Sequence, residues 1–228
     1  MTHTSQPIAL VTGASRGLGH ALADALAERG WRLVVDARDT SVLELPNATI
    51  VPGDVTSEDH RAALVRQVGP RLDLLVNNAS ALGPSPLVPL ADLPLDALRH
   101  VYETNVVAPV ALIQLLLPAL RTAKGAVLNL SSDAAVEAYE GWGGYGSSKA
   151  ALDHVSAVLA AEEPALRVYA VDPGDMRTAM HQAAFPGEDI SDRPKPETVV
   201  PSLLRLLDSR PGSGRFRASD WAGAEVQA

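Results

Sequence analysis

The sequence predicts a single α/β domain built on one doubly wound parallel sheet of about seven strands, with helices on both faces. Short apolar runs alternate with helical patterns along the whole chain, which is typical of βαβ units and a parallel sheet. A glycine-rich turn follows the first apolar run directly. The 228 residues fit one such domain, and no internal repeat or shift in composition indicates a second one. We therefore expect one domain over residues 1–228.

Each expected strand is a short, largely aliphatic run bounded by polar or glycine-containing segments. The last of them, near the C-terminus, has the weakest pattern. The seven expected strands are Ile8–Val11, Leu33–Val35, Thr49–Val51, Leu72–Val76, Ala126–Leu130, Arg167–Val171 and Arg215–Ala218.

The clearest expected helix connects the first two strands. Leucine and alanine residues in Leu18–Leu26 repeat at helical spacing, and Gly30 supplies the end of the helix. Thr56, which precedes a run of acidic residues, is the expected N-cap of the second helix. The segment Asp175–Pro196 shows no clear periodicity, so it is either a lid over a site or a plain surface excursion.

Net charge and residue usage exclude several classes of function. A formal net charge of -8 without any basic run argues against a nucleic-acid partner. The chain contains no cysteine, which removes disulfides, thiolate catalysis and cysteine-ligated metals. Its six histidines are scattered, and we expect no metal site.

The apolar segments favour a cytoplasmic protein without membrane contact. The N-terminus lacks the charged-then-apolar pattern of a signal peptide. The longest apolar stretch, Val106–Leu120, is interrupted by Gln114 and by two prolines, and it is shorter than the roughly 18 to 20 residues that cross a bilayer. We therefore expect a buried helix there.

The turn T-G-A-S-R-G-L-G after the first strand indicates a nucleotide site. Gly13, Gly17 and Gly19 permit a tight strand-to-helix turn and a close approach of a pyrophosphate to the backbone. The free N–H groups and the dipole at the helix N-terminus favour such an anion. The glycine-rich turn lies between a strand and a helix of the first βαβ unit, and this context makes it stronger evidence for a nucleotide site than the glycines alone.

Tyr145 and Lys149 indicate proton-transfer chemistry. They are four residues apart at the start of a helical pattern, so both side chains lie on one face of that helix, one turn apart. A free tyrosine titrates at about pH 10, and we expect the neighbouring ammonium to lower the pKa of the phenol. A phenol tuned in this way can protonate an alkoxide that forms when a hydride arrives.

Further motifs stand at matching places along nearly the whole chain. They are the glycine spacing G-x-x-x-G-x-G, Asp54-Val55 after the third strand, Asn77-Asn78-Ala79 at the end of the fourth, Pro173-Gly174 after the sixth, and Ser132 thirteen residues before Tyr145. On these motifs the chain resembles the short-chain dehydrogenase/reductase family, which implies a Rossmann-type fold and a nicotinamide cofactor. The cofactor residues that this resemblance implies are Gly13, Ser15, Arg16, Gly17, Leu18, Gly19, Arg38, Asp54, Val55, Asn78, Ala79, Tyr145, Lys149, Pro173, Gly174 and Thr178.

The resemblance also implies catalytic roles. Tyr145 is then the acid/base, Ser132 hydrogen-bonds the substrate oxygen, and Lys149 also holds the nicotinamide ribose. Asn105, in the fourth expected helix, matches an asparagine that supports a proton relay through water. Ser131 is one residue out of this spacing, so we interpret it as a structural hydrogen-bonding residue.

Two positions depart from the family pattern. Ser80 stands where glycine is usual, and its hydroxyl would narrow or polarise the floor under the cofactor. Met176 stands where a β-branched residue often follows the proline and glycine, and it would reshape the face beside the carboxamide. Neither departure removes a reacting group.

The residues after the second strand bear on the choice between NADP and NAD. Arg38 falls where similar NADP-using proteins carry a basic residue, and Arg16 is a second cation that could reach a 2′-phosphate. Asp36 favours NAD, but it lies one residue before the acidic position of NAD-using members, which is Ala37 here. The pattern favours NADP(H) and leaves NAD(H) open.

The substrate is predicted only as a small carbonyl or alcohol compound, because the family accepts very different carbonyls. Trp142, Met176 and Met180 are candidates for an apolar pocket, with Phe185 nearby. We interpret His181 as an exposed and incidental loop histidine.

The favoured function is an NADP(H)-dependent reductase of ketones or aldehydes. An NAD-dependent alcohol dehydrogenase of the same family is the first alternative, and a non-catalytic nucleotide sensor or scaffold is the second, although Tyr145 and Lys149 are both present. The apolar helix at Val106–Leu120, together with the resemblance, predicts a homodimer or homotetramer.

Overall fold

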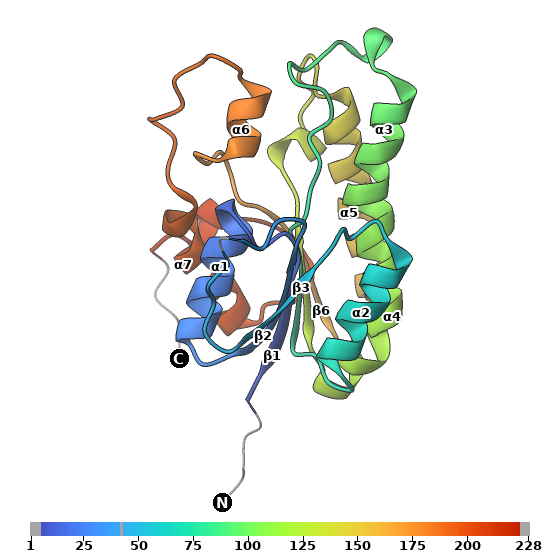
Figure 1. Cartoon of the computed structure of the whole chain (residues 1–228), viewed down its shortest axis with the longest axis vertical. Helices are drawn as coiled ribbons and strands as arrows, with labels where there is room; N and C mark the ends of the chain where they lie inside the picture. Colours follow the sequence, from blue (N-terminus) through green and yellow to red (C-terminus); the bar gives the residue numbers. More distant parts are fainter. Residues whose placement is uncertain (1–5, 42, 224–228) are drawn as a thin grey trace, which may run out of the picture.

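The computed structural model describes residues 6–41 and 43–223. Its centre is one seven-stranded sheet in the order β3-β2-β1-β4-β5-β6-β7, and every neighbouring pair of strands is parallel (Figure 1). This confirms the expected fold class, and each expected strand overlaps an observed one. The strands are β1 (Ile8–Val11), β2 (Arg32–Ala37), β3 (Ala48–Pro52), β4 (Leu74–Asn77), β5 (Ala126–Leu130), β6 (Arg167–Asp172) and β7 (Gly214–Arg217).

Helices cover both faces of this sheet (Figure 1). One face carries α1 (Gly17–Glu28) and α7 (Pro196–Ser209). The other face carries α2 (Glu58–Val68), α4 (Ala108–Ala123) and α5 (Gly143–Glu162). The remaining helices, α3 (Leu95–Tyr102) and α6 (Ala179–Ala184), lie beyond the carboxyl ends of the strands. Short 3₁₀ turns occur at Leu90–Asp92, Asp133–Ala135 and Ala218–Trp221.

The strands read as continuous apolar runs because both of their faces are buried. In β1, Val11 packs into the layer beneath α1 and α7, while Leu10 packs into the layer beneath α2 and α4. The strand order reverses between β1 and β4. At such a switch point a crevice opens beyond the carboxyl ends of the strands, which is where doubly wound proteins bind their ligands.

The fourth helix is longer and less buried than the sequence predicted. Together with α3 and a π-helical segment, Glu103–Val107, it forms one helical run from Leu95 to Ala123. An 18-residue window of this 29-residue run has a mean hydropathy of 1.7, and 39% of that window is buried in the structure. By length and composition alone, the run could therefore cross a membrane. The core helix of a soluble protein passes the same test. Leu112 and Leu116 pack against the sheet, whereas Val107 and Leu115 are exposed.

Two local predictions were wrong. Ser57, rather than Thr56, caps α2, because its hydroxyl accepts the N–H of His60 while the Thr56 hydroxyl donates to Asp54 at 2.8 Å. The segment expected to be without periodicity contains α6, which is capped by Thr178. A helix of six residues is too short to show a periodic pattern in the sequence.

Candidate active site

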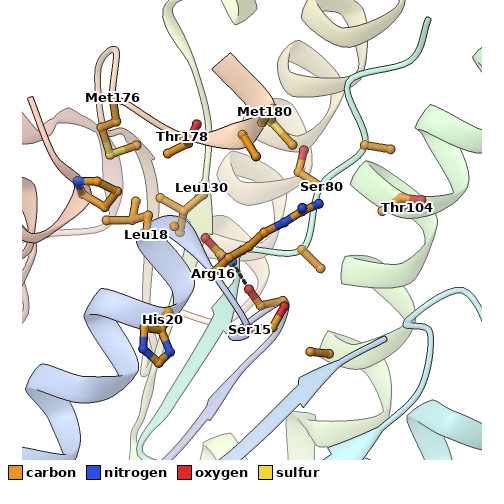
Figure 2. A pocket seen from close by; sticks show the side chains of 18 of the residues that line it. Ser15, Arg16, Leu18, His20, Ser80, Thr104, Leu130, Met176, Thr178 and Met180 are labelled. Carbon is orange, nitrogen blue, oxygen red and sulfur yellow. Dashed lines mark hydrogen bonds between the residues drawn. The ribbon is translucent and has the colours of Figure 1, made fainter. Parts of the chain in front are cut away.

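A cavity of about 840 Å³ opens beyond the carboxyl ends of the strands. Its walls come from the glycine turn, the ends of β2 and β3, the loop after β4, and the segment that leads into α6. Figure 2 shows Ser15 and Arg16 on the side of the glycine turn, and Met176, Thr178 and Met180 on the side of the α6 segment. Ligand pockets of proteins typically measure about 300 to 1,000 Å³, so the cavity can hold a dinucleotide-sized molecule.

The cavity brings together most of the expected cofactor residues. Gly19 and Gly174 are the exceptions: Gly174 lines a smaller recess beside the cavity, and Gly19 packs under the glycine turn. The expected residues that line the cavity are Gly13, Ser15, Arg16, Gly17, Leu18, Arg38, Asp54, Val55, Asn78, Ala79, Tyr145, Lys149, Pro173 and Thr178.

The glycines of the turn are required by its backbone. Gly13 and Gly17 have φ values of +66° and +61°, in the left-handed region that side chains disfavour. Gly19 is needed for close packing, because a Cβ there would lie 2.6 Å from the carbonyl oxygen of Gly13 and also collide with the Asn78 amide. A larger residue at Gly13 or Gly19 would therefore collide with Ala79 or Asn78 and displace the turn from β4, whereas at Gly17 the backbone angle alone disfavours it.

Thr12 and Asn78 fasten the glycine turn to the end of β4. The backbone N–H groups of Asn78 and Ala79 both donate to the Thr12 hydroxyl at 3.0 Å. The Asn78 amide donates in return to the carbonyl oxygens of Thr12, at 2.8 Å, and Gly13, at 3.1 Å. The asparagine motif therefore holds the glycine turn in shape.

Asp36 is committed to the protein interior. It is 1% exposed, and its carboxylate accepts the Gly13 N–H at 2.6 Å through Oδ1. Its other oxygen lies 3.0 Å from Nε2 of the buried His60. Both oxygens are thus occupied beneath the glycine turn, although the residue touches the edge of the cavity.

Two arginines bring positive charge to the cavity. Arg16 and Arg38 are both exposed and line it, and Figure 2 shows Arg16 reaching out from the glycine turn. Asp54 lies on the same side. Partial burial raises the pKa of its carboxyl, but hydrogen bonds from Thr56 and the charge of Arg38 outweigh this effect and lower it overall.

Tyr145 and Lys149 lie on the buried face of α5. The Lys149 ammonium donates to the carbonyl oxygen of Leu130 at 2.7 Å and lies 5.4 Å from the centre of the Tyr145 ring. Burial lowers the pKa of Lys149 to about 8, although the charge of Asp153 opposes this shift.

Burial also raises the pKa of the Tyr145 phenol, and the neighbouring hydroxyls of Ser132 and Ser80 counteract part of this increase. This differs from the expectation that the Lys149 ammonium lowers the phenol pKa. The cause is that the phenol is fully desolvated while the ammonium is directed to a backbone carbonyl.

Asn105 lies inside the π-helical segment between α3 and α4 and lines neither the cavity nor the recess. Its amide nitrogen donates to the carbonyl oxygen of Ala81 and to the Ser148 hydroxyl, both at 2.9 Å. Its amide oxygen accepts the Ala81 N–H at 2.8 Å. The side chain therefore ties the loop after β4 to α5, and π-helical turns of this kind are frequent at functional sites.

Ser80, where the family pattern has glycine, lies beside Tyr145. Its hydroxyl donates to the Asn105 amide oxygen at 3.1 Å and, from this position, lowers the pKa of the Tyr145 phenol. The expectation that Ser80 polarises the cofactor floor is consistent with this position. Its contact with the phenol was not apparent from the sequence.

Ser132 lies near Tyr145 at the end of β5. Its hydroxyl donates to Oδ1 of Asp133 at 2.9 Å and accepts the Ala134 N–H at 3.2 Å. The second oxygen of Asp133 accepts the Tyr139 hydroxyl at 2.9 Å. Arg215 of β7 supports the same turn by donating to the Ser132 carbonyl oxygen at 2.9 Å.

A second recess of about 110 Å³ adjoins the cavity at Ser131 and Tyr145. Ser132 and the expected substrate residues Trp142, Met176 and Met180 line this recess. Two interpretations were wrong there. Ser131 makes no side-chain hydrogen bond, and its buried hydroxyl faces both hollows. His181 is not exposed, because its side chain is only 9% accessible and lines the recess.

Several residues at the site were missed by sequence reasoning. They are Asp133, Asp172, His60 and Arg215. Asp172 ends β6, and Asp133 lies three residues after the end of β5. A polar residue at or just beyond the carboxyl end of a parallel strand is a signal that could have found both. His60 and Arg215 act across long distances in the chain, and no local pattern identifies them.

Known proteins share this architecture. A benzil reductase of Saccharomyces cerevisiae, which forms (S)-benzoin, is 31% identical over 215 residues that cover 86% of this chain and 80% of the relative. A short chain dehydrogenase of Shigella flexneri 2a complexed with NADP superposes with a TM-score of 0.84 at 31% identity, covering 93% of this chain and 97% of that one. A short chain dehydrogenase of Escherichia coli complexed with NADPH superposes with a TM-score of 0.83 at 31% identity, covering 93% of this chain and 96% of that one.

The family comparison extends over most of the described residues. Residues 7–189 match the family described as short chain dehydrogenase, from β1 to beyond α6. This range includes the glycine turn and both residues of the buried tyrosine and lysine pair. The chain therefore belongs to the short-chain dehydrogenase family of NAD(P)-dependent oxidoreductases.

Proposed function

We propose that this protein is an NADP(H)-dependent reductase of ketones or aldehydes, acting as one domain, with Tyr145 as its proton donor. The observation that carries the proposal is the position of Tyr145, which lines both hollows, between Lys149 in the cavity and Ser132 in the recess. Bound cofactor supplies the hydride. The cavity offers the phosphate-binding turn on one side and the Tyr145 phenol on the other.

The chain's own groups would handle the proton. The Ser132 hydroxyl turns its proton from Asp133 to the substrate oxygen, which orients the carbonyl and stabilises charge on that oxygen. The Tyr145 phenol then donates its proton to the same oxygen. Lys149 holds the nicotinamide ribose, and the Ser132 and Ser80 hydroxyls, which lower the pKa of the phenol, stabilise the phenolate that remains. The Asn105 side chain fixes the loop after β4. The backbone of the π-helical segment that contains Asn105 would then bind the water through which the proton is relayed.

NADP(H) is favoured over NAD(H) by three observations. Arg16 and Arg38 line the cavity with exposed guanidinium groups that suit a phosphate. The Asp36 carboxylate is bonded to Gly13 and His60, which turns it away from a ribose. Two similar solved proteins are complexed with NADP or NADPH.

The substrate is proposed to be a small carbonyl compound. Trp142, Met176 and Met180 give the recess an apolar wall, and the yeast relative is named as a reductase of benzil, a diaryl ketone. We further propose a cytoplasmic homodimer or homotetramer that contacts its partner through α4 and the end of the π-helical segment, where Leu115 and Val107 are exposed.

The test is a panel of ketones and aldehydes offered with NADPH and with NADH, followed by the absorbance of the reduced nicotinamide. Turnover with NADPH supports the proposal. Faster turnover with NADH would favour the NAD-dependent dehydrogenase instead. Tight cofactor binding without turnover of any carbonyl or alcohol would favour the nucleotide sensor.

A further inference from the structure

The recess beside Tyr145 is acidic. Asp133, Asp172 and Asp175 line it, and within the described ranges no lysine or arginine side chain does. Asp172 is 6% exposed, so its carboxylate feels little screening from water. Burial raises its pKa, and the nearby charge of Asp133 raises it further. These carboxylates repel one another across a small volume, and a cation between them would relieve that repulsion.

The nearest arginines are committed to other groups. Arg215 donates to Oδ2 of Asp153 at 2.8 Å and to the Ser132 carbonyl, and it lies 4.0 Å from the Asp172 carboxylate. Arg217 faces Glu137 at 3.9 Å. Each arginine therefore has its own acidic partner. Asp175 already faces Nδ1 of His181 at 3.8 Å and Nε of Arg193 at 3.7 Å. Asp133 and Asp172 are therefore the carboxylates of the recess that remain only partly neutralised.

Two buried polar atoms in the recess have no partner in the described structure. One is the hydroxyl oxygen of Ser131, a residue that is 3% exposed. The other is Nε2 of His181, whose side chain is 9% exposed. Buried polar groups are normally hydrogen-bonded, so two unpartnered atoms facing one hollow indicate a ligand that carries polar groups of its own.

The opposite wall suits the body of such a ligand. Trp142 packs edge-on against the Tyr145 ring, with the ring centres 5.7 Å apart, and Met176 and Met180 complete the surface. An indole beside carboxylates favours a cation through its π face as well as through charge. An anionic group placed beside Asp133 and Asp172 would be repelled by their carboxylates.

We propose that this recess selects carbonyl compounds that carry an ammonium group close to the carbonyl carbon, and that it discriminates against compounds with a carboxylate in that place. The inference rests on the carbonyl-reducing function proposed above. The ammonium would lie between Asp133 and Asp172, while the carbonyl oxygen faces Ser132 and Tyr145.

The test uses three ketones of similar shape with NADPH: 3-(aminomethyl)acetophenone, 3-ethylacetophenone and 3-acetylbenzoate. We expect kcat/KM to fall in that order, by about tenfold at each step at low salt, because one or two charges at such distances are worth this much in a partly screened site. Asp172→Asn keeps the shape of the side chain and should reduce the preference for the ammonium over the ethyl compound several-fold. The matched control is Asp208→Asn, which removes a charge from an exposed ion pair with Arg29 and should leave the preference unchanged.

Other outcomes would overturn the inference. Equal kcat/KM for the three ketones would overturn the inference and leave the reductase function intact. The inference would also fail if Asp208→Asn reduced the preference for the ammonium compound as much as Asp172→Asn does. A changed affinity ratio of NADP⁺ to NADPH in Asp172→Asn, with the ketone preference unchanged, would mean that the carboxylates serve the charged nicotinamide instead. If the wild-type protein reduces none of the three ketones, the proposed function fails for this class of ketone. The charge preference is then decided by saturation-transfer NMR, which measures binding of the same ketones to the NADP⁺-loaded protein.

Discussion

The backbone N–H of Gly13 donates a 2.6 Å hydrogen bond to the buried carboxylate of Asp36, and this bond joins the glycine turn to the end of β2. His60 of α2 occupies the other carboxylate oxygen. An acidic residue that the sequence offered as a ribose ligand is therefore a support for the turn. The relationship predicts how each part of the site responds to substitution.

Replacing Asp36 by alanine should destabilise the protein and weaken both cofactors alike. The change leaves the Gly13 N–H and the buried His60 unpaired, which costs roughly 2 to 5 kcal/mol. Urea unfolding and calorimetric titration with NADPH and NADH measure the two effects, and Asp59→Ala on exposed α2 surface is the control. A selective gain in NADPH affinity would show instead that the carboxylate faces the 2′-phosphate.

Replacing Arg38 by leucine should lower the affinity for NADPH by about 10- to 100-fold and leave that for NADH nearly unchanged. A charge-assisted hydrogen bond to the phosphate is worth roughly 1.5 to 3 kcal/mol, and NADH lacks this phosphate. Dissociation constants at low salt decide the matter, with Arg66→Leu on exposed α2 surface as control. Equal weakening of both cofactors, or tighter binding of NADH by wild type, would favour the NAD-dependent alternative.

Replacing Tyr145 by phenylalanine should abolish most turnover and leave cofactor binding almost intact. The ring that packs against Trp142 remains, and only the transferable proton is lost. Single-turnover rates together with NADPH titration separate the two effects. Turnover within a few-fold of wild type would rule out the phenol as the proton donor.

Replacing Ser80 by alanine should shift the pH dependence of alcohol oxidation to higher pH. The Ser80 hydroxyl lowers the phenol pKa, so its removal raises that pKa, and the phenolate needed to accept a proton then forms only in more alkaline solution. At neutral pH the oxidation rate should fall by several-fold. Ser80→Thr keeps the hydroxyl and should restore the wild-type profile, whereas an unchanged profile in Ser80→Ala would contradict the contact.

Replacing Leu115 by glutamate should dissociate the expected oligomer. Leu115 is 47% exposed on α4 near the similarly exposed Val107, and a charge there would be buried in any interface along this helix. Light scattering at micromolar concentration measures the assembly, and Val136→Glu provides an exposed control on another surface. A monomeric wild-type protein would remove the basis for the interface.

The sequence by itself determined the fold class, and most of the residues that it predicted for a cofactor do line the cavity. Strands such as Ala126–Leu130 are buried on both faces, so their sequences are almost continuously apolar and can be recognised without the structure. The glycine turn could also be recognised in the sequence, because Gly13 and Gly17 adopt positive φ angles at which residues with a Cβ are strained. Tyr145 and Lys149 were found because helical spacing alone places them on one face.

Only the tertiary structure decided the orientation and burial of individual side chains. Asp36 and His60 are 24 residues apart, and no local pattern shows that they pair beneath the glycine turn. The acidity of the recess comes from Asp133 and Asp172, at the ends of strands that only the parallel sheet brings side by side. The pKa of Tyr145 likewise depends on how deeply α5 buries the phenol. Hydrogen bonding and desolvation act over a few ångströms in space, whereas sequence patterns report only neighbours along the chain.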